Sequence, residues 1–276
     1  MINATGNRMT MEIRRQSALA QQISDTQISV STGRRIQRGS DDPVAAARVA
    51  NSRQAQADNV TWQSNLILGG ALAAQADGIL QSMSARLARA QELMVAGTSA
   101  SVNATDRATI ALELNGIAAD LDGYAAATSS LGTALFASGA APEIRFGSGA
   151  VFAPVSSRSD VFETNGTALS QIVRNAATAV TSGDPAQTGA SLTALQRSVG
   201  HVADVAADVG VRAARIDRLR ETLEQNNVEF SAERSQLEDT DLSEAIARLN
   251  AQTLTLEAAQ SAFARINRRS LFDILN

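Results

Sequence analysis

Few residues of this chain have the types and spacing that chemistry at a site requires. The single histidine, His201, is the first candidate, because imidazole serves both as a metal ligand and as a general base. Three carboxylates lie close together in Glu238-Asp239-Thr240-Asp241, as a cation site or an acid–base pair would require. Gly147-Ser148-Gly149 contains the glycines that a phosphate-binding loop uses.

None of these features is accompanied by the partners that its chemistry needs. One histidine supplies too few ligands for a zinc site, and the chain has no cysteine. No Gly-Lys-Ser/Thr element follows the glycine pair. Acidic residues favour a helix N-terminus, which explains Glu238, Asp239 and Asp241 as capping residues. We predict no enzyme activity, metal or cofactor, and a packing or surface role for His201; an enzyme on a helical scaffold is the alternative class.

The basic residues and the apolar runs limit the possible partners. All 24 basic residues are arginine, no basic run exceeds two residues, and the net charge is −4. Nucleic-acid binding needs a clustered basic face, so no nucleic acid is expected. No apolar run approaches the roughly 18 residues of a membrane span, so no membrane anchor is expected. The amphipathic segment 1–30 resembles an organellar transit peptide, but it has a natural partner helix at the other end of the chain.

Near the C-terminus, one series of apolar residues repeats every seven positions. A strict heptad keeps one stripe of an α-helix against a partner, and no proline interrupts the run. The second heptad positions are weaker, because Arg220 and Asn227 end their apolar series. The pattern predicts one long helix whose first heptad positions are Leu195, Val202, Val209, Ile216, Leu223, Phe230 and Leu237.

The first half of the chain is also predicted to be helical. A helix over 5–31 ends at a glycine-containing break, 32–40. Aspartate followed by Pro43 starts the next helix, which is expected to run far. A second heptad along it consists of Leu66, Ala73, Leu80, Leu87 and Met94. A break over 97–103 precedes a further helix from Thr105 to about residue 127.

The middle of the chain changes character, because glycine, serine and proline become common over 138–166. Two short strands are expected there, at 143–146 and 160–163, with 147–149 as a turn after the first. The helical pattern then returns at Leu169.

At the C-terminal end the apolar series is displaced. It passes from Leu237 to Leu242, a step of five residues instead of seven, so the stripe rotates around the helix. Each chain end thus carries an amphipathic helix separated from the interior by a break, and the simplest way to bury both stripes is against each other.

These patterns predict a mainly α fold. We expect a long antiparallel helical hairpin or coiled-coil rod made from both chain ends, with a small β-rich insertion in the middle. The predicted parts are a terminal helical coiled-coil assembly module, 1–39 with 238–276; a helical rod, 40–137 with 167–237; and a small β-hairpin-like insertion, 138–166.

Several motifs, in their order along the chain, resemble those of the flagellin superfamily. They are Ser31-Thr32-Gly33-Arg34-Arg35-Ile36, Ser40-Asp41-Asp42-Pro43-Val44-Ala45-Ala46 and Leu237-Glu238-Asp239-Thr240-Asp241-Leu242-Ser243-Glu244-Ala245. The segment Ile144-Arg145-Phe146-Gly147-Ser148-Gly149 and the tail Ser270-Leu271-Phe272-Asp273-Ile274-Leu275 are similar to the hook–filament junction family within it. The insertion is short for that family, and Ser138 stands where it has glycine, so a compact flagellin is the alternative.

The resemblance implies a structural subunit of the bacterial flagellum, a junction adaptor between hook and filament, or alternatively flagellin, the self-polymerising filament subunit. It implies an extracellular location, reached through type III export without a cleaved signal peptide. The implied partners are other copies of the chain in a ring, hook-associated protein 1 on the hook side, flagellin on the filament side, and an export chaperone with the export apparatus.

The predicted sites are an assembly interface and a hinge. We expect the stripes of the terminal helices to pair within the chain and to meet neighbouring subunits, because such helices are marginal alone. The interface residues are Ile2, Met9, Ile13, Ile23, Leu242, Leu249, Leu256, Phe263, Ile266, Leu271 and Phe272. The hinge would let the inner rod adjust to hook and filament, and its residues are Gly33, Gly39, Asp239 and Asp241.

Overall fold

The computed structural model describes residues 2–99 and 102–272, with the side chains of residues 7, 9–99 and 102–265. The chain forms two compact units, one of residues 1–57 with 227–276 and one of residues 58–226. The three-part division expected from the sequence has other boundaries and stays a prediction.

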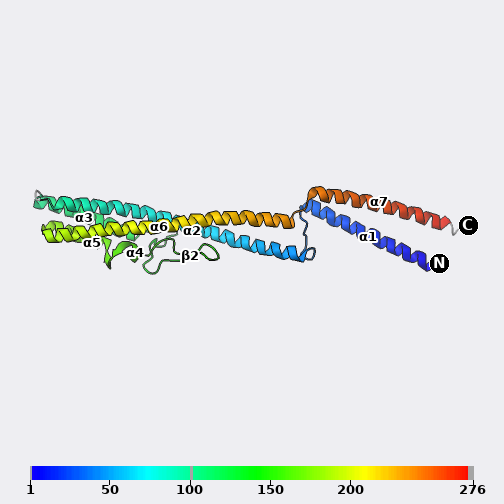
Figure 1. The fold of residues 1–276 in the computed structure, drawn as a ribbon, viewed down its shortest axis with the longest axis horizontal. Coiled ribbons are helices and arrows are strands. Elements are labelled where there is room, and N and C mark those ends of the chain that lie inside the picture. Colours follow the sequence, from blue (N-terminus) through cyan, green and yellow to red (C-terminus); the bar gives the residue numbers. More distant parts are fainter. Residues whose placement is uncertain (1, 100–101, 273–276) are drawn as a thin grey trace. The chain divides into compact units, whose positions relative to one another are not determined.

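Helices make up most of the described chain, which confirms the mainly α prediction (Figure 1). The helices are α1 (Ile2–Thr32), α2 (Pro43–Gly97), α3 (Ala104–Ala125), α4 (Arg158–Phe162), α5 (Leu169–Ser182), α6 (Pro185–Glu238) and α7 (Leu242–Phe272). The strands are β1 (Ile144–Arg145), β2 (Val151–Phe152), β3 (Glu163–Thr164) and β4 (Thr167–Ala168). They form two antiparallel pairs, β1 with β2 and β3 with β4.

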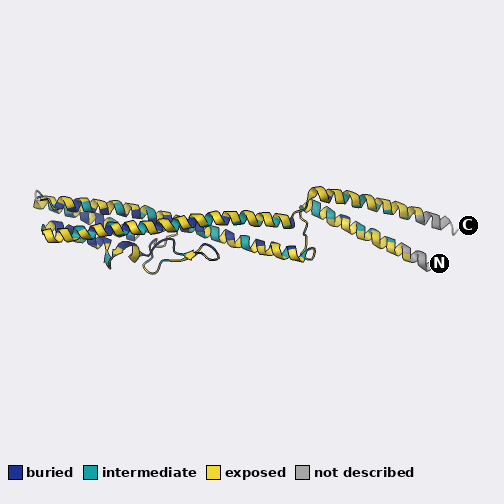
Figure 2. Ribbon diagram, in the orientation of Figure 1, coloured by how far each residue is buried: buried dark blue, intermediate teal, exposed yellow. Residues whose placement is uncertain are grey.

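The core of the unit 58–226 lies where the two predicted heptads meet. Residues of α2, α3, α5 and α6 share one buried apolar cluster, and Figure 2 shows the buried positions recurring along these helices. The buried heptad residues are Leu66, Ala73, Leu80, Leu87 and Met94 on α2, and Leu195, Val202, Val209, Ile216 and Leu223 on α6. The heptad prediction is confirmed for these residues, while Phe230 and Leu237 are half-buried.

Helix ends follow the capping chemistry that the sequence suggested. Helix α2 begins at Pro43, and Asp42 Oδ1 accepts the Ala45 N–H at 3.0 Å. Helix α3 is capped by Asn103, whose side chain accepts the Asp106 N–H at 2.9 Å. Helix α5 ends at Ser182 and is capped by Gly183, which adopts the left-handed conformation at φ 68°.

The β-rich insertion was predicted only in part. The strand expected at 143–146 is present as β1, and residues 147–149 form the connection to β2. The strand expected at 160–163 is wrong, because residues 158–162 form the short helix α4. The Ser157 hydroxyl accepts the Asp160 N–H at 3.2 Å, so a local cap favours a helical turn over an extended chain.

A glycine of α2 allows the β1–β2 hairpin to pack closely. A Cβ atom on Gly69 would lie 2.6 Å from the Phe146 ring, so only glycine fits beneath it. Phe146 belongs to a second buried cluster with Leu66 and Ile216, and Trp62 packs against that cluster. The hairpin is thereby anchored on the helices of its unit.

Candidate functional site

Helices α1 and α7 lie side by side and run antiparallel within their unit (Figure 1). Their less exposed residues recur at alternating steps of four and three, the spacing that keeps one seam between two helices. The α1–α7 seam consists of Glu12, Gln16, Leu19, Ile23, Thr26 and Val30 on α1, and Ala245, Leu249, Gln252, Leu256, Ala259 and Phe263 on α7.

The α1–α7 seam is only partly apolar. The Thr26 hydroxyl lies 3.0 Å from Gln252 Oε1 across it, and Glu12 and Gln16 occupy two further positions. Among the described side chains of the two helices, only Ile23 and Ala245 are fully buried. The pair therefore buries little apolar surface by itself, and its hydrophobic stabilisation is correspondingly small.

The residues predicted as an assembly interface divide into two groups. On the α1–α7 seam lie buried Ile23 and half-buried Leu249, Leu256 and Phe263. About half of the surface of three others is exposed: Met9, Ile13 and Leu242. The side chains of Ile2, Ile266, Leu271 and Phe272 lie outside the described residues.

Four more apolar side chains of these helices are exposed and were not predicted. Met11 and Leu254 are 69% and 68% exposed, and Ile28 and Ile246 are also exposed. Sequence reasoning passed over them because they lie off the seven-residue series. A count of apolar residues outside the stripe would have found them, since a helix of a self-sufficient pair presents a polar outer face.

The segments that join the helices are paired through their backbones. The Arg35 N–H donates to Glu238 O at 2.7 Å, and the Thr240 N–H donates to Gly33 O at 2.9 Å. We call these two hydrogen bonds the linker clasp. Arg34 and Asp239 form an isolated antiparallel bridge within it. The predicted hinge residues Gly33 and Asp239 thus lie together, and Gly33 adopts φ 68°.

The other two predicted hinge residues have separate positions. Asp241 caps α7, because its Oδ1 accepts the N–H groups of Ser243 at 2.9 Å and Glu244 at 3.1 Å. Gly39 is exposed and has no other atom within 4 Å of the position of a Cβ. Whether the four residues act as a hinge stays a prediction.

Asp41 orders the linker between α1 and α2. Its Oδ2 accepts the N–H groups of Arg38 at 2.8 Å and Gln37 at 3.0 Å. These two hydrogen bonds hold the pKa of the Asp41 carboxyl below its ordinary value, because they stabilise the charged form.

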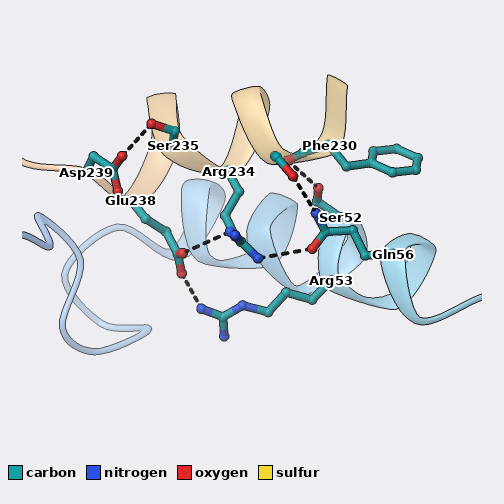
Figure 3. A network of polar contacts seen from close by, with 9 residues as sticks. Ser52, Arg53, Gln56, Phe230, Arg234, Ser235, Glu238 and Asp239 are labelled. Atoms are coloured by element: carbon teal, nitrogen blue, oxygen red, sulfur yellow. Dashed lines mark hydrogen bonds and ion pairs between the residues drawn. The ribbon is translucent and has the colours of Figure 1, made fainter. Parts of the chain in front are cut away.

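A polar network ties the C-terminal end of α6 to the first turns of α2 (Figure 3). The buried carboxylate of Glu238 forms ion pairs with Arg53 of α2 and, at 3.8 Å, with Arg234 of its own helix. Arg234 also donates to Gln56 Oε1 at 3.1 Å, and Ser235 bonds to Asp239. The four-residue step between Arg234 and Glu238 is readable in the sequence, whereas Arg53 lies 185 residues from Glu238 and gives no local signal.

The residues that first suggested chemistry do not form a reactive site. His201 is half-buried, and its Nε2 has no hydrogen-bond partner. In the described ranges, 2–99 and 102–272, no group of three or more His, Cys, Asp or Glu residues is arranged to hold a metal ion. Nor is any helix in those ranges long and apolar enough to cross a membrane. At the chain ends, by contrast, exposed apolar side chains gather on α1 and α7.

Two family models match most of the chain. The model of the bacterial flagellin N-terminal helical region matches residues 2–141, and that of the C-terminal helical region matches residues 192–275. The residues between the two matches include α4, both small strand pairs and α5.

Two curated relatives are named flagellar hook-associated protein 3. The protein of Salmonella typhimurium is 31% identical over 108 residues, and that of Escherichia coli is 29% identical over 108 residues. Each alignment covers 39% of this chain and 34% of the relative, so the chain spans about a third of the length of the curated relatives it matches.

A solved structure has the same fold. It is described as that of a flagellar hook-associated protein from Vibrio parahaemolyticus, and its TM-score to this chain is 0.65 at 16% identity. The likeness covers 72% of this chain and 100% of the other.

Proposed function

The chain belongs to the flagellin family, and from that membership we propose that it is a structural subunit of the bacterial flagellum, a junction adaptor between hook and filament. The two relatives named hook-associated protein 3 support the junction role. The proposed partners are other copies of the chain in a ring, hook-associated protein 1 on the hook side and flagellin on the filament side. Its proposed location is the extracellular flagellum, reached through the flagellar export apparatus with an export chaperone.

The observation that carries this proposal is the incomplete burial of α1 and α7. Met11 and Leu254 are largely exposed, and Met9, Ile13 and Leu242 are about half exposed. The α1–α7 seam is partly polar, and both helices expose apolar side chains outside it. Such exposed apolar surface favours burial against further subunits. The proposed assembly interface therefore includes the predicted residues and the exposed apolar residues beside them.

A self-polymerising filament subunit is the second candidate. It is favoured by the two matching family models, which are those of flagellin itself, and by the small size of the insertion between them. Both functions use the same terminal helices. They differ in the partner, which is the hook and the filament for a junction adaptor and further copies of itself for a filament subunit.

Seeded polymerisation separates the two functions. Purified chain is seeded and salted out, and in parallel it is added to isolated hooks that carry hook-associated protein 1, with electron microscopy of both. The junction role predicts no filaments from the chain alone and a new ring on the hook tips. Long filaments from the chain alone would show a flagellin. If neither filaments nor rings formed, both functions would be contradicted.

A further inference from the structure

A basic groove opens beside the linker clasp, within the unit of residues 1–57 and 227–276. Its volume is about 190 Å³, and Arg34, Arg38 and Arg53 line it. The carboxylate among its lining residues is that of Glu238, and Val49 of α2 contributes to its apolar side. Three arginines and one glutamate therefore line the same groove.

The interactions of Glu238 show which ligand the groove accepts. The Glu238 side chain is only 11% exposed, and its two oxygens are held by Arg53 and Arg234 (Figure 3). Arginine recognises carboxylates through several N–H donors in one plane, and such charge-assisted hydrogen bonds are stronger than neutral ones. One arginine of the groove, Arg53, thus already pairs with a carboxylate of its own chain.

The remaining two arginines are available for further carboxylates. Arg34 and Arg38 are exposed, and within residues 2–99 and 102–272 neither forms an ion pair. Asp41 is the acidic group near Arg38. Its Oδ2 accepts the backbone N–H groups of Arg38 and Gln37, and the positive charge of Arg38 makes a smaller contribution to lowering the pKa of the Asp41 carboxyl. Arg34 and Arg38 consequently keep guanidinium groups that no ion pair holds within the described ranges.

An acidic pair on α6 supplies the complementary charge. Glu229 and Glu233 are one helical turn apart, both are exposed, and neither forms an ion pair with another described residue. Arg234 and Glu238 mark the side of α6 that faces α2. At about 100° per residue, Glu229 and Glu233 point well away from that side, so they do not enter the groove of their own chain.

We propose that the basic groove of one copy binds Glu229 and Glu233 of a second copy, through Arg34 and Arg38. This inference rests on the proposed function, in which copies of the chain assemble. The two patches differ, so the contact is head-to-tail, and repeating it generates a ring or a helical array instead of a closed pair.

Charge reversal tests the contact in assembled material. The variants are Arg34→Glu with Arg38→Glu, Glu229→Arg with Glu233→Arg, and the combination of all four, each added to hooks at low salt. Either reversal alone is expected to weaken assembly by about tenfold or more, because attraction becomes repulsion, and the combination is expected to restore most of it. Arg48→Glu and Glu221→Arg are matched controls on α2 and α6, and both are expected to assemble normally.

Cross-linking gives a second readout, which reports proximity while Arg34 and Glu229 are left to hold the contact. The chain has no cysteine, so Arg38→Cys and Glu233→Cys each create one thiol. The two variants, made with tags of different size, are mixed, assembled and treated with a short bis-maleimide. Cross-linked heterodimers are expected, and Arg48→Cys mixed with Glu233→Cys serves as the control pair.

The outcomes separate this inference from the proposed function. Wild-type chain that neither decorates hooks nor polymerises contradicts both. Wild-type chain that assembles, while the combined reversal fails to rescue and no heterodimer forms, contradicts the groove contact alone. Replacing chloride by sulfate at equal ionic strength is expected to reduce the cross-link, because sulfate competes with carboxylates for the same arginines; a cross-link that sulfate leaves unchanged would contradict recognition by the groove.

Discussion

Gly33 and Asp41 shape the same linker by different means. Gly33 supplies a backbone conformation that other residues adopt at a cost, with φ 68°, and its carbonyl accepts one bond of the linker clasp. Asp41 supplies a charged acceptor for two backbone N–H groups. Single substitutions at these residues therefore probe the backbone and the electrostatics of the linker separately.

Substituting Gly33 by alanine is expected to weaken the clasp. The left-handed conformation costs a residue with a Cβ about 1–2 kcal/mol, so the clasp should open more often. Hydrogen exchange of the Thr240 amide measures this opening, and faster exchange is expected. Gly39→Ala is the matched control, since Gly39 has no positive φ and open space around it; equal exchange in the two variants would contradict the argument.

Acidification is expected to loosen the linker through Asp41. Its pKa is lowered in the folded chain, so the ionised carboxylate stabilises the linker above the unfolded-state pKa, which lies near 3.8. That contribution is lost as the pH falls below the unfolded value and through the lowered folded one. The Arg38 amide should therefore exchange faster, relative to its intrinsic rate, at such acidic pH than at neutral pH. In Asp41→Asn this extra pH dependence should disappear, and its persistence would assign it to another group.

At the scale of elements, helix packing was readable where residue type and period agree. The heptads of α2 and α6 identified ten buried residues, because a seven-residue repeat places its members on one stripe that faces a partner helix. The sequence misled at 160–163, where alternation suggested a strand but Ser157 caps a helical turn. The contact of Arg53 with Glu238 forms between two helices that are far apart in the sequence, so no local pattern could have revealed it.

Gly69→Ala is expected to disturb the docking of the β1–β2 hairpin on α2. The added methyl group would lie 2.6 Å from the Phe146 ring, and such overpacking costs about 1–3 kcal/mol. Urea unfolding monitored by Trp62, the only tryptophan, reports on the cluster that contains Phe146. Gly78→Ala, with no atom near its Cβ position, is expected to stabilise α2 slightly instead. A Gly69→Ala variant as stable as the Gly78→Ala control would contradict the close contact.

At the scale of the whole molecule, the chain separates a well-packed unit from a sparsely packed one. The two buried clusters lie within residues 58–226, whereas α1 and α7 have few buried side chains among their described residues. Changes in α1 and α7 should therefore affect assembly without unfolding the unit of residues 58–226.

Deleting residues 242–276 should leave the unit 58–226 folded and abolish assembly. Neither buried cluster contains a residue of α7 whose side chain the structure describes, so the cooperative thermal transition followed by circular dichroism should persist. Electron microscopy of hooks incubated with the truncated chain is expected to reveal no added protein. Decoration equal to that by the full chain would contradict a role of the terminal helices in assembly.

The hydrogen bond between Thr26 and Gln252 joins residues 226 positions apart. Bringing such distant residues together is slow and entropically costly until other contacts have shortened the intervening loop. The buried cluster that holds both Leu66 and Leu223 provides that shortening. We therefore expect the interior of the chain to pack before its ends pair. A chain that lacks α7 has no partner for Thr26 across the seam, so its α1 is left without this contact.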